Sequence, residues 1–343
     1  MKVKNLVQEF VAGEDTKGYD SAHASTLLQL KDGNVLSAWF GGSWEESSDV
    51  AIWGARRING VWEEPRVLVN VWDVALWNPV LFRKENGGII LFFKVGKQIE
   101  MWKTWYVESY DEGMTFTEPK ELVENDPSNG RGPVKNKPIR LADNTVLAPA
   151  SWEADKWDAF VDISTDDCKT WTTSQLVPLR RSSYEIQMVD RPYNKHYIYG
   201  QGVIQPTLWQ DSEGAVHMFL RTTSSRIFRS DSVDGGRTWS MAYDTGLPNN
   251  NSGIDLVKMS NGNLVLVYNP RENLPNYYKG PRTPLTVAVS KDNGETFEEI
   301  LVLEDKQGNY CYPAVICDDT NKIMITYTWN RENIVYCEFE LEE

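Results

Sequence analysis

Short polar turns recur along the whole chain, and a run of β-branched and aromatic residues follows each of them. The turns begin at residues 31, 85, 142, 211, 260 and 318, which gives spacings of 54, 57, 69, 49 and 58 residues. Runs such as VLSAWF (35–40) after a Gly, Asn or Asp turn are typical of β-hairpins. A repeat of this length constrains the fold, because each unit needs a neighbour to cover its apolar face.

A second series of turns lies out of phase with the first and follows the pattern Ser-x-Asp-x-Gly-x-Thr-Trp/Phe, known as the Asp-box. The copies are SYDEGMTF (109–116), STDDCKTW (164–171), SVDGGRTW (232–239) and SKDNGETF (290–297), with RRINGVW (56–62) as a degenerate fifth. The Asp oxygens suit the amides of a tight turn, and Gly suits its unusual backbone angles. Cys168 replaces this Gly in the second copy, which predicts a turn that is strained or of another type. Because the motif is repeated, we assign it a structural role.

Two hairpins per unit give four strands in roughly 50–60 residues, and six such units predict an all-β, six-bladed β-propeller of four-stranded antiparallel blades. We expect a single domain over residues 1–343 and no helix of useful length. The sixth unit ends near Leu341 without an Asp-box. The segment VKNLVQEFV (3–11) is therefore expected to pair with the last blade and close the ring.

Composition excludes several classes of partner. The formal charge is −14, from 35 basic and 49 acidic residues, so a nucleic-acid surface is not expected. No stretch approaches the ~18 apolar residues of a membrane span. The N-terminus lacks the apolar segment of a signal peptide, so we expect a cytoplasmic protein, or a secreted one whose signal peptide has been removed. The four cysteines have no metal-like spacing, and we expect neither a metal nor a cofactor. The oligomeric state stays open.

The Asp-boxes and the six-fold period resemble those of the sialidase superfamily, specifically its bacterial Asp-box branch. The resemblance implies three arginines that clamp a substrate carboxylate, a Tyr nucleophile assisted by a Glu, and an Asp that acts as acid and base. HMFLRTTSS (217–225) then places a clamp arginine at Arg221, GPRTPLTV (280–287) places another at Arg282, and YCYPAVIC (310–317) places the nucleophile at Tyr312.

The acidic loop GGSWEESSD (41–49) lies where the resemblance expects the acid. Glu45 is the first choice for this role, followed by Glu46 and Asp49, and Asp49 is also expected to contact the substrate. The stretch NGRGPVKNKPI (129–139) brings Arg131 and Lys135 as further candidates for substrate binding.

Two positions depart from the family pattern. His23, in HASTL (23–27), stands where the first clamp arginine is expected, and Gln205, in IQPTLW (204–209), stands where the assisting Glu is expected. An amide cannot accept the proton that a carboxylate would accept. We count both residues among the candidate catalytic groups, because each keeps a polar side chain in the site.

The first hypothesis is an exo-acting glycosidase that cleaves a terminal carboxylated sugar, sialic-acid-like or uronic, from an acidic oligosaccharide or glycoconjugate. The second is a uronate lyase of the rhamnose–glucuronate type, in which arginines neutralise the carboxylate and His23 or Tyr312 is the base. The third is a carbohydrate-binding propeller without turnover.

Overall fold

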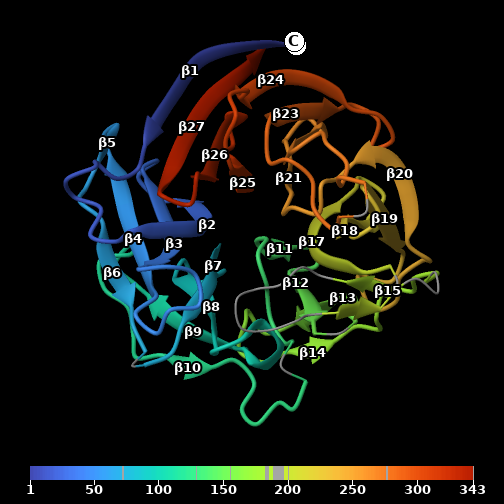
Figure 1. Ribbon diagram of the computed structural model, residues 1–343, viewed down its shortest axis with the longest axis horizontal. Coiled ribbons are helices and arrows are strands. Elements are labelled where there is room, and N and C mark those ends of the chain that lie inside the picture. Colours follow the sequence, from blue (N-terminus) through green and yellow to red (C-terminus); the bar gives the residue numbers. More distant parts are fainter. Residues whose placement is uncertain are drawn as a thin grey trace.

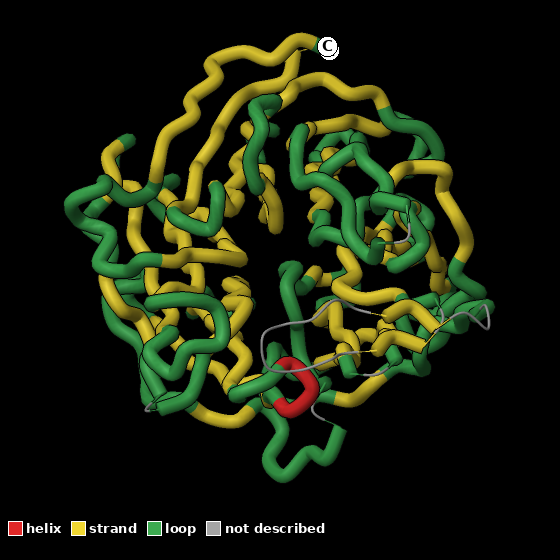
Figure 2. The backbone as a smooth tube through the Cα atoms, viewed as in Figure 1, coloured by secondary structure: helices red, strands yellow, loops and turns green. Residues whose placement is uncertain are grey.

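The computed structural model describes residues 1–71, 73–128, 130–154, 156–181, 185–187, 197–199, 201–275 and 277–342. Six antiparallel sheets are arranged in a ring around a central axis (Figure 1), which confirms the predicted six-bladed propeller. The tube view shows how fully strands dominate the chain (Figure 2). The one helix among the described residues is a single 3-10 turn, η1 (Ile99–Met101), and no described helix is long and apolar enough to cross a membrane.

The blades follow one another in chain order, with their innermost strands facing the ring centre (Figure 1). The first three blades are β2 (Ser21–Gln29), β3 (Val35–Gly42), β4 (Ala51–Ile58), β5 (Val61–Trp62) and β6 (Arg66–Val69); β7 (Leu76–Arg83), β8 (Ile89–Val95), β9 (Lys103–Ser109) and β10 (Lys120–Glu121); and β11 (Ile139–Arg140), β12 (Val146–Glu153), β13 (Trp157–Ser164) and β14 (Thr172–Thr173). In blade 1 both β5 and β6 pair with β4, so two short strands share the outer position.

The other three blades have the same order from the centre outward. They are β17 (Val203–Gln210), β18 (Val216–Thr222), β19 (Arg226–Ser232) and β20 (Tyr243–Pro248); β21 (Asp255–Lys258), β22 (Leu264–Tyr268), β23 (Leu285–Ser290) and β24 (Glu298–Glu304); and β25 (Tyr310–Cys317), β26 (Lys322–Trp329), β27 (Asn333–Glu342) and β1 (Lys2–Phe10). A separate hairpin is formed by β15 (Glu185–Gln187) and β16 (Tyr197–Tyr199).

The first strand of the chain completes the last blade. β1 pairs antiparallel with β27, from Lys2 opposite Glu342 to Phe10 opposite Val335. The pairing covers the outer edge of β27, which would otherwise present unpaired backbone groups. It also holds blade 6 beside blade 1.

Several middle strands are buried along almost their whole length because neighbouring blades cover both of their faces. Every residue of β3 is buried, although VLSAWFGG does not alternate between polar and apolar residues. Between blades 1 and 2, the ring of Phe40 lies 5.9 Å from that of Trp77, which in turn lies 5.9 Å from Trp102. These three rings therefore pack together where blade 1 meets blade 2.

The four clear Asp-boxes form the same hydrogen-bonded turn. In the copy at 232–239, Asp234 accepts from the Thr238 amide at 2.9 Å and from the Thr238 hydroxyl at 2.6 Å, and the Gly236 amide donates to Ser232 Oγ at 2.9 Å. Desolvation acts to raise the pKa of Asp234, but these bonds from Thr238 and Ser232 outweigh it and lower the pKa to about 2. The acidic residues of the boxes are thus occupied in holding turns.

Cys168 occupies the position of the usual Gly in the Asp-box at residues 164–171. Its amide donates to Ser164 Oγ at 2.9 Å, as the Gly of the other copies does, and its φ is +70°. The turn is therefore of the same type, and a residue with a Cβ occupies the left-handed region, where Gly carries no steric cost. All four cysteines of the chain are free thiols.

Replacement of Asp234 by Ala is expected to lower the free energy of unfolding at neutral pH by about 1 kcal/mol, the size of a net hydrogen-bond contribution at an exposed position. The folded pKa of about 2 lies below the usual 3.8, so the unfolded chain binds more protons, and this contribution disappears as the pH falls toward 2. Urea unfolding of both proteins from pH 7 down to pH 2 measures the difference.

Asp234→Asn is the matched control for this prediction, since it keeps one acceptor oxygen for the turn amides and removes the titrating group. A stability difference between wild type and Asp234→Ala that stayed constant down to pH 2 would contradict the assignment.

Candidate functional site

Four of the innermost strands carry a β-bulge near the same point, and a residue with a left-handed φ lies in each bulge. These residues are Ala24, Asn78, Gln205 and Tyr312, with φ of 52°, 42°, 52° and 53°. Bulges turn a side chain away from the direction that strand alternation would give it, and backbone strain of this kind concentrates at functional sites. The shared position therefore marks the ring centre as the candidate site.

Tyr312, on β25, is the residue on which the site converges. Its hydroxyl accepts a hydrogen bond from Arg221 Nη1 at 2.8 Å. Three cations also lie over its ring: Arg221 at 5.8 Å, Arg282 at 5.6 Å and Lys135 at 6.0 Å from the centroid. The structure thus brings together four residues that are far apart in the sequence.

Arg221 joins Tyr312 to Gln205. The same Nη1 atom of Arg221 donates to Gln205 Oε1 at 3.0 Å, and Arg221 Nε donates to Asn251 Oδ1 at 2.8 Å. Gln205 Nε2 in turn donates to the Glu153 carboxylate at 3.2 Å, which fixes the orientation of the amide. Burial raises the pKa of Glu153, although the charge of Arg221 acts in the opposite direction. A carboxylate is therefore present one residue further from Tyr312 than the family pattern expects.

His23, on β2, lies against Tyr312 with ring centroids 4.2 Å apart and is 1% exposed. Its Nδ1 lies 2.8 Å from Thr328 Oγ1, which also accepts from the Ala24 amide at 3.1 Å. Because that hydroxyl has its own hydrogen to donate to Nδ1, we assign the proton of His23 to Nε2. Nε2 is buried and has no hydrogen-bond partner among the described residues.

Burial lowers the pKa of His23 well below 6.5, and the nearby charges of Arg331, Arg282, Arg221 and Lys135 lower it further. His23 is therefore neutral at physiological pH. It stands where the family pattern expects an arginine, but it supplies no positive charge there.

Arg282 lies over the ring of Tyr312 and also contacts the thiol of Cys311. Its Nη1 donates to Cys311 Sγ at 2.9 Å, and its backbone carbonyl accepts from the Tyr310 amide at 3.0 Å. The side chain is half-buried, and the carboxylates of the described ion pairs are bound by other cations. Arg282 is thus held near the site without being neutralised by a described ion pair.

Lys135 is buried beneath Tyr312, where its ammonium contacts Asn136 Oδ1 at 2.8 Å, the Ile254 carbonyl at 3.0 Å and the Pro313 carbonyl. Burial lowers the pKa of Lys135 to about 7. With three acceptors around it, Lys135 ties the innermost strands of blades 5 and 6 to the segment before β11. Lys135 thereby supports the strand that carries Tyr312.

Arg131, a candidate for substrate binding, does not join this cluster. Its Nε donates to Asp162 Oδ1 at 2.8 Å and its Nη2 donates to the Trp171 carbonyl at 3.0 Å. Asp162 is fully buried and requires a cationic partner. The positive charge of Arg131 is therefore neutralised by Asp162 inside blade 3.

Glu45 lies in the loop between β3 and β4, as expected, but its carboxylate binds an arginine that sequence reasoning did not select. Arg331 Nη1 donates to Glu45 Oε2 at 2.5 Å. Arg331 belongs to the turn between β26 and β27, and its carbonyl accepts from the Ala22 amide at 2.9 Å. Blade 6 thus reaches across to the strand that carries His23.

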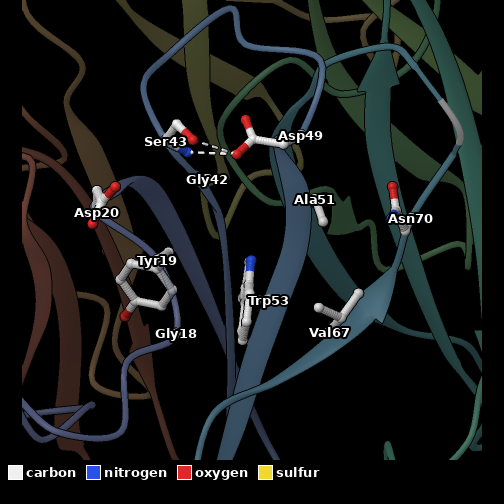
Figure 3. Close-up of a pocket in the computed structure, with 10 residues that line it drawn as sticks. All are labelled: Gly18, Tyr19, Asp20, Gly42, Ser43, Asp49, Ala51, Trp53, Val67 and Asn70. Carbon is white, nitrogen blue, oxygen red and sulfur yellow. Dashed lines mark hydrogen bonds between the residues drawn. The ribbon is translucent and has the colours of Figure 1, made fainter.

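Asp49 is also placed elsewhere than expected. Its carboxylate accepts from the Ser43 amide at 3.0 Å and from the Ser43 hydroxyl at 2.5 Å, and no described contact joins it to Tyr312. It lines a hollow of about 250 Å³ beside Tyr19 and Trp53, on the strands of blade 1 (Figure 3). Asp49 therefore braces the loop that carries Glu45.

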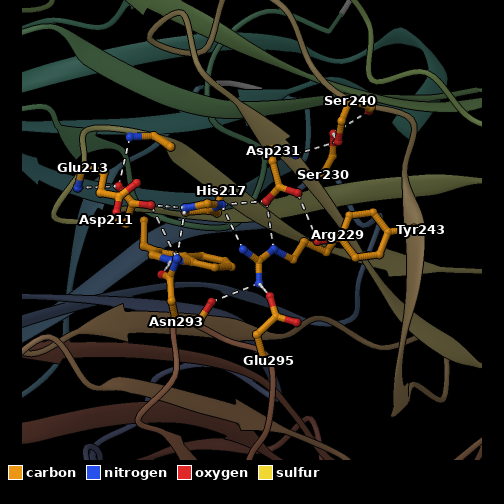
Figure 4. A network of polar contacts seen from close by, with 12 residues as sticks. Asp211, Glu213, His217, Arg229, Ser230, Asp231, Ser240, Tyr243, Asn293 and Glu295 are labelled. Atoms are coloured by element: carbon orange, nitrogen blue, oxygen red, sulfur yellow. Dashed lines mark hydrogen bonds and ion pairs between the residues drawn. The ribbon is translucent and has the colours of Figure 1, made fainter.

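A second polar cluster lies outside the site, in blade 4 (Figure 4). His217 is held between Asp231 at 2.6 Å from Nδ1 and Asp211 at 2.9 Å from Nε2, and its ring stacks on Trp209 at 5.0 Å. Trp209 Nε1 donates to Asn293, in the Asp-box of blade 5, at 2.8 Å. Both ring nitrogens are occupied and the cluster joins two blades, so its role is structural.

Sequence reasoning missed Glu153 and Arg331. Three bulge residues precede a proline, in Asn78-Pro79, Gln205-Pro206 and Tyr312-Pro313, and this shared step was the signal available for the ring centre. Glu153 and Arg331 have no such marker. Among the described residues, no group of three or more His, Cys, Asp or Glu side chains is arranged to hold a metal ion.

Comparisons with known proteins agree with this architecture. The profile of a family described as a BNR repeat-like domain matches residues 33–325. A comparison with curated protein sequences finds no match. Among solved structures, a Dyadobacter fermentans protein of unknown function has a TM-score of 0.75 at 15% identity, and the match covers 99% of this chain and 100% of that one.

Sialidases are also similar in structure. A Hadza microbial sialidase has a TM-score of 0.76 at 17% identity, over 98% of this chain and 68% of the other. The NanB sialidase of Streptococcus pneumoniae has a TM-score of 0.73 at 12% identity, over 96% of this chain and 70% of the other. At these identities the likeness shows the fold alone.

Replacement of Lys135 by Met is expected to lower the free energy of unfolding by about 2–4 kcal/mol, because the buried carbonyls of Ile254 and Pro313 lose their donor. Guanidinium unfolding monitored by tryptophan fluorescence measures the change. Lys258→Met, which removes a half-buried lysine bonded to the Gln210 carbonyl at 2.7 Å, is the matched control and should cost less. Equal losses in the two variants would contradict the central position given to Lys135.

Proposed function

The chain belongs to the family of BNR repeat-like domains with a sialidase-like propeller fold, and on this premise we propose that it is an exo-glycosidase acting on a terminal carboxylated sugar. The observation that carries the proposal is the position of Arg221. One nitrogen of its guanidinium contacts both the hydroxyl of Tyr312, at 2.8 Å, and the amide of Gln205, at 3.0 Å. A phenol, a cation and an amide bonded to a half-buried carboxylate thus lie together at the ring centre.

A carboxylated ligand fits the charge around Tyr312. The whole protein carries a formal charge of −14, yet Arg221, Arg282 and Lys135 surround this one ring. At short range a few buried or half-buried cations outweigh distant surface charges, which salt screens over about 8–10 Å. Guanidinium groups also match the two oxygens of a carboxylate in shape.

In the proposed hydrolysis, the Tyr312 oxygen bonds to the anomeric carbon as the glycosidic carbon–oxygen bond breaks, and the phenol proton passes to water. The leaving oxygen takes up a proton from water. A second water molecule then attacks the anomeric carbon, breaks its bond to the Tyr312 oxygen and returns a proton to that oxygen. A neutral phenol suits an anomeric carbon that carries a carboxylate, because a carboxylate nucleophile would be repelled by that charge. Arg221 stabilises the negative charge that develops on the phenol oxygen.

One observation favours a second candidate, a uronate lyase. The described polar partner of the Tyr312 hydroxyl is a cation, and Gln205 stands between it and the Glu153 carboxylate. In β-elimination the Tyr312 phenolate would remove the proton next to the sugar carboxylate, a carbon–carbon double bond would form, and the leaving oxygen would receive the proton back from Tyr312. The arginines would neutralise the carboxylate and make that proton acidic.

One assay separates these reactions. The protein is incubated with 4-methylumbelliferyl glycosides of N-acetylneuraminic and glucuronic acid and with uronate-containing oligosaccharides, while reducing sugar and the ultraviolet absorbance of unsaturated uronate are followed. Reducing sugar without absorbance supports hydrolysis, and absorbance supports the lyase. Binding without either product would overturn both candidates and leave the carbohydrate-binding propeller.

Replacement of Tyr312 by Phe is expected to lower kcat on the order of 10³-fold and to leave substrate binding nearly unchanged, because only the reacting oxygen is lost. Steady-state kinetics on the substrate identified above measure both parameters. Tyr310→Phe is the matched control, since Tyr310 lies on the same strand and packs against Trp329 at 6.5 Å. Full turnover by Tyr312→Phe would rule out both roles of the tyrosine.

Gln205→Glu is expected to destabilise the protein, because it places a second carboxylate 3.2 Å from Glu153. The double variant Glu153→Gln/Gln205→Glu exchanges the two groups and keeps the net charge, so it should recover the melting temperature. If the chain is a hydrolase, the double variant should also hydrolyse at least as fast as wild type, because its carboxylate lies beside Tyr312. Slower hydrolysis by the stable double variant would contradict the assisting role given to position 205.

A further inference from the structure

The hollow of about 250 Å³ in blade 1 has a lining distinct from the residues described around Tyr312 (Figure 3). Its walls come from the connection between β1 and β2, from the loop between β3 and β4 with the start of β4, and from β6 with the segment after it. Pockets that enclose a drug-sized ligand usually measure about 300–1,000 Å³. The volume of this hollow therefore suits a smaller ligand, of the size of one sugar ring.

Trp53, on β4, forms an aromatic wall of the hollow. Its half-buried ring meets that of Tyr19 at 5.3 Å with an interplanar angle of 70°, and its Nε1 donates to the Gly41 carbonyl at 3.1 Å. Gly18 passes against the other end of the indole, where a Cβ would lie 2.9 Å from Cη2 of Trp53. These contacts hold the indole in one orientation, so a ligand meets a wall that is already in place.

Polar side chains surround this aromatic wall. Asp20 and Asn70 are exposed, and their side chains have no hydrogen-bond or ion-pair partner within the described part of the chain. The Asp49 carboxylate is held in place by the amide of Ser43 at 3.0 Å and by its hydroxyl at 2.5 Å. The hollow thus combines a fixed aromatic ring with a carboxylate and an amide that are available to a ligand.

The charge of the hollow is opposite to that of the ring centre. Two carboxylates, Asp20 and Asp49, line it, and its described lining contains neither lysine nor arginine. A carboxylated sugar would be repelled here, because like charges at short range disfavour binding. A neutral sugar has hydroxyl groups that donate to carboxylates, and hydrogen bonds to a charged acceptor are among the stronger ones.

We propose that the hollow is a second carbohydrate-binding site, which takes a neutral hexopyranose. The C–H face of the sugar packs on Trp53, Asp20 accepts from sugar hydroxyls, and the Asn70 amide donates and accepts. The site goes beyond the proposed function, because binding in the hollow requires no reaction at Tyr312. It lies beside the ring centre, since Asp20 precedes His23 by three residues and their Cα atoms are at most about 11 Å apart.

The first test is binding of neutral sugars to the wild-type protein. Methyl glycosides of glucose, galactose and mannose are titrated against the protein, and saturation-transfer difference NMR measures Kd. At least one of them is expected to bind with a Kd on the order of 1 mM, the range of a small ligand that makes few contacts. Binding of none of the three would overturn the inference.

Asp20→Ala places the bound sugar in the hollow. The variant is expected to raise Kd for the neutral glycoside about tenfold or more, because one charge-assisted hydrogen bond is lost. Asp15→Ala is the matched control, since Asp15 is an exposed carboxylate of the same connection between β1 and β2 but lies outside the hollow. An unchanged Kd in Asp20→Ala, or an equal rise in Asp15→Ala, would overturn the site.

Variants of Trp53 test the aromatic wall. Trp53→Phe keeps a smaller ring and Trp53→Leu removes the ring, so Kd for the neutral glycoside should rise from wild type to Phe to Leu. Melting temperatures show whether each variant folds. If Trp53→Leu does not fold, Asn70→Ala changes only an exposed side chain and should raise Kd about 3–10-fold. Wild-type affinity in both Trp53→Phe and Asn70→Ala would overturn the inference.

Carboxylated sugars separate this inference from the proposed function. Asp20→Ala and Asn70→Ala should keep the wild-type Kd for any carboxylated sugar that binds at the ring centre. Weakened binding of that sugar in both variants would overturn the hollow as a separate site. Failure of the wild-type protein to bind or turn over any carboxylated sugar, with neutral glycosides still bound, would instead overturn the proposed function and leave the inference standing.

Discussion

The pairing of the first strand with the last is the contact on which the site depends. β1 lies along β27 over the length of both strands, so the ring closes between blade 1 and blade 6. That closure places His23 against Tyr312 and lets Arg331 reach Glu45. Loss of the pairing would expose the edge of β27 and separate the two halves of the site.

Charge at the ring centre is set by burial as much as by residue type. His23 is neutral because burial penalises its charged form, while Lys135 keeps three acceptors and Arg221 donates to a phenol and an amide. An acidic protein thus presents a local positive site at Tyr312. Arg131 shows the opposite outcome, since its charge is used to neutralise the buried Asp162.

The fold could be predicted from the sequence because its turn motifs repeat along the chain. Turn residues and Asp-boxes recur at nearly equal spacing, and each local hairpin requires only near neighbours. The residues of the site could be predicted only in part. The motifs before the Asp-boxes marked Arg221 and Arg282, and the last-blade segment marked Tyr312. Asp49 binds Ser43 of its own loop, and a sequence does not show which residue a loop uses to brace itself.

Sequence by itself determined the six hairpin units and the architecture, since local turn chemistry depends on short stretches of chain. The residues at the centre were indicated by the resemblance to sialidases and not by that local pattern. Tertiary structure alone decided which charges meet. Glu153 behind Gln205 and Arg331 beside His23 are pairs formed between blades, 52 and more than 300 residues apart in the chain. Closure of the ring sets the distances between residues of different blades, and a local sequence pattern does not predict these distances.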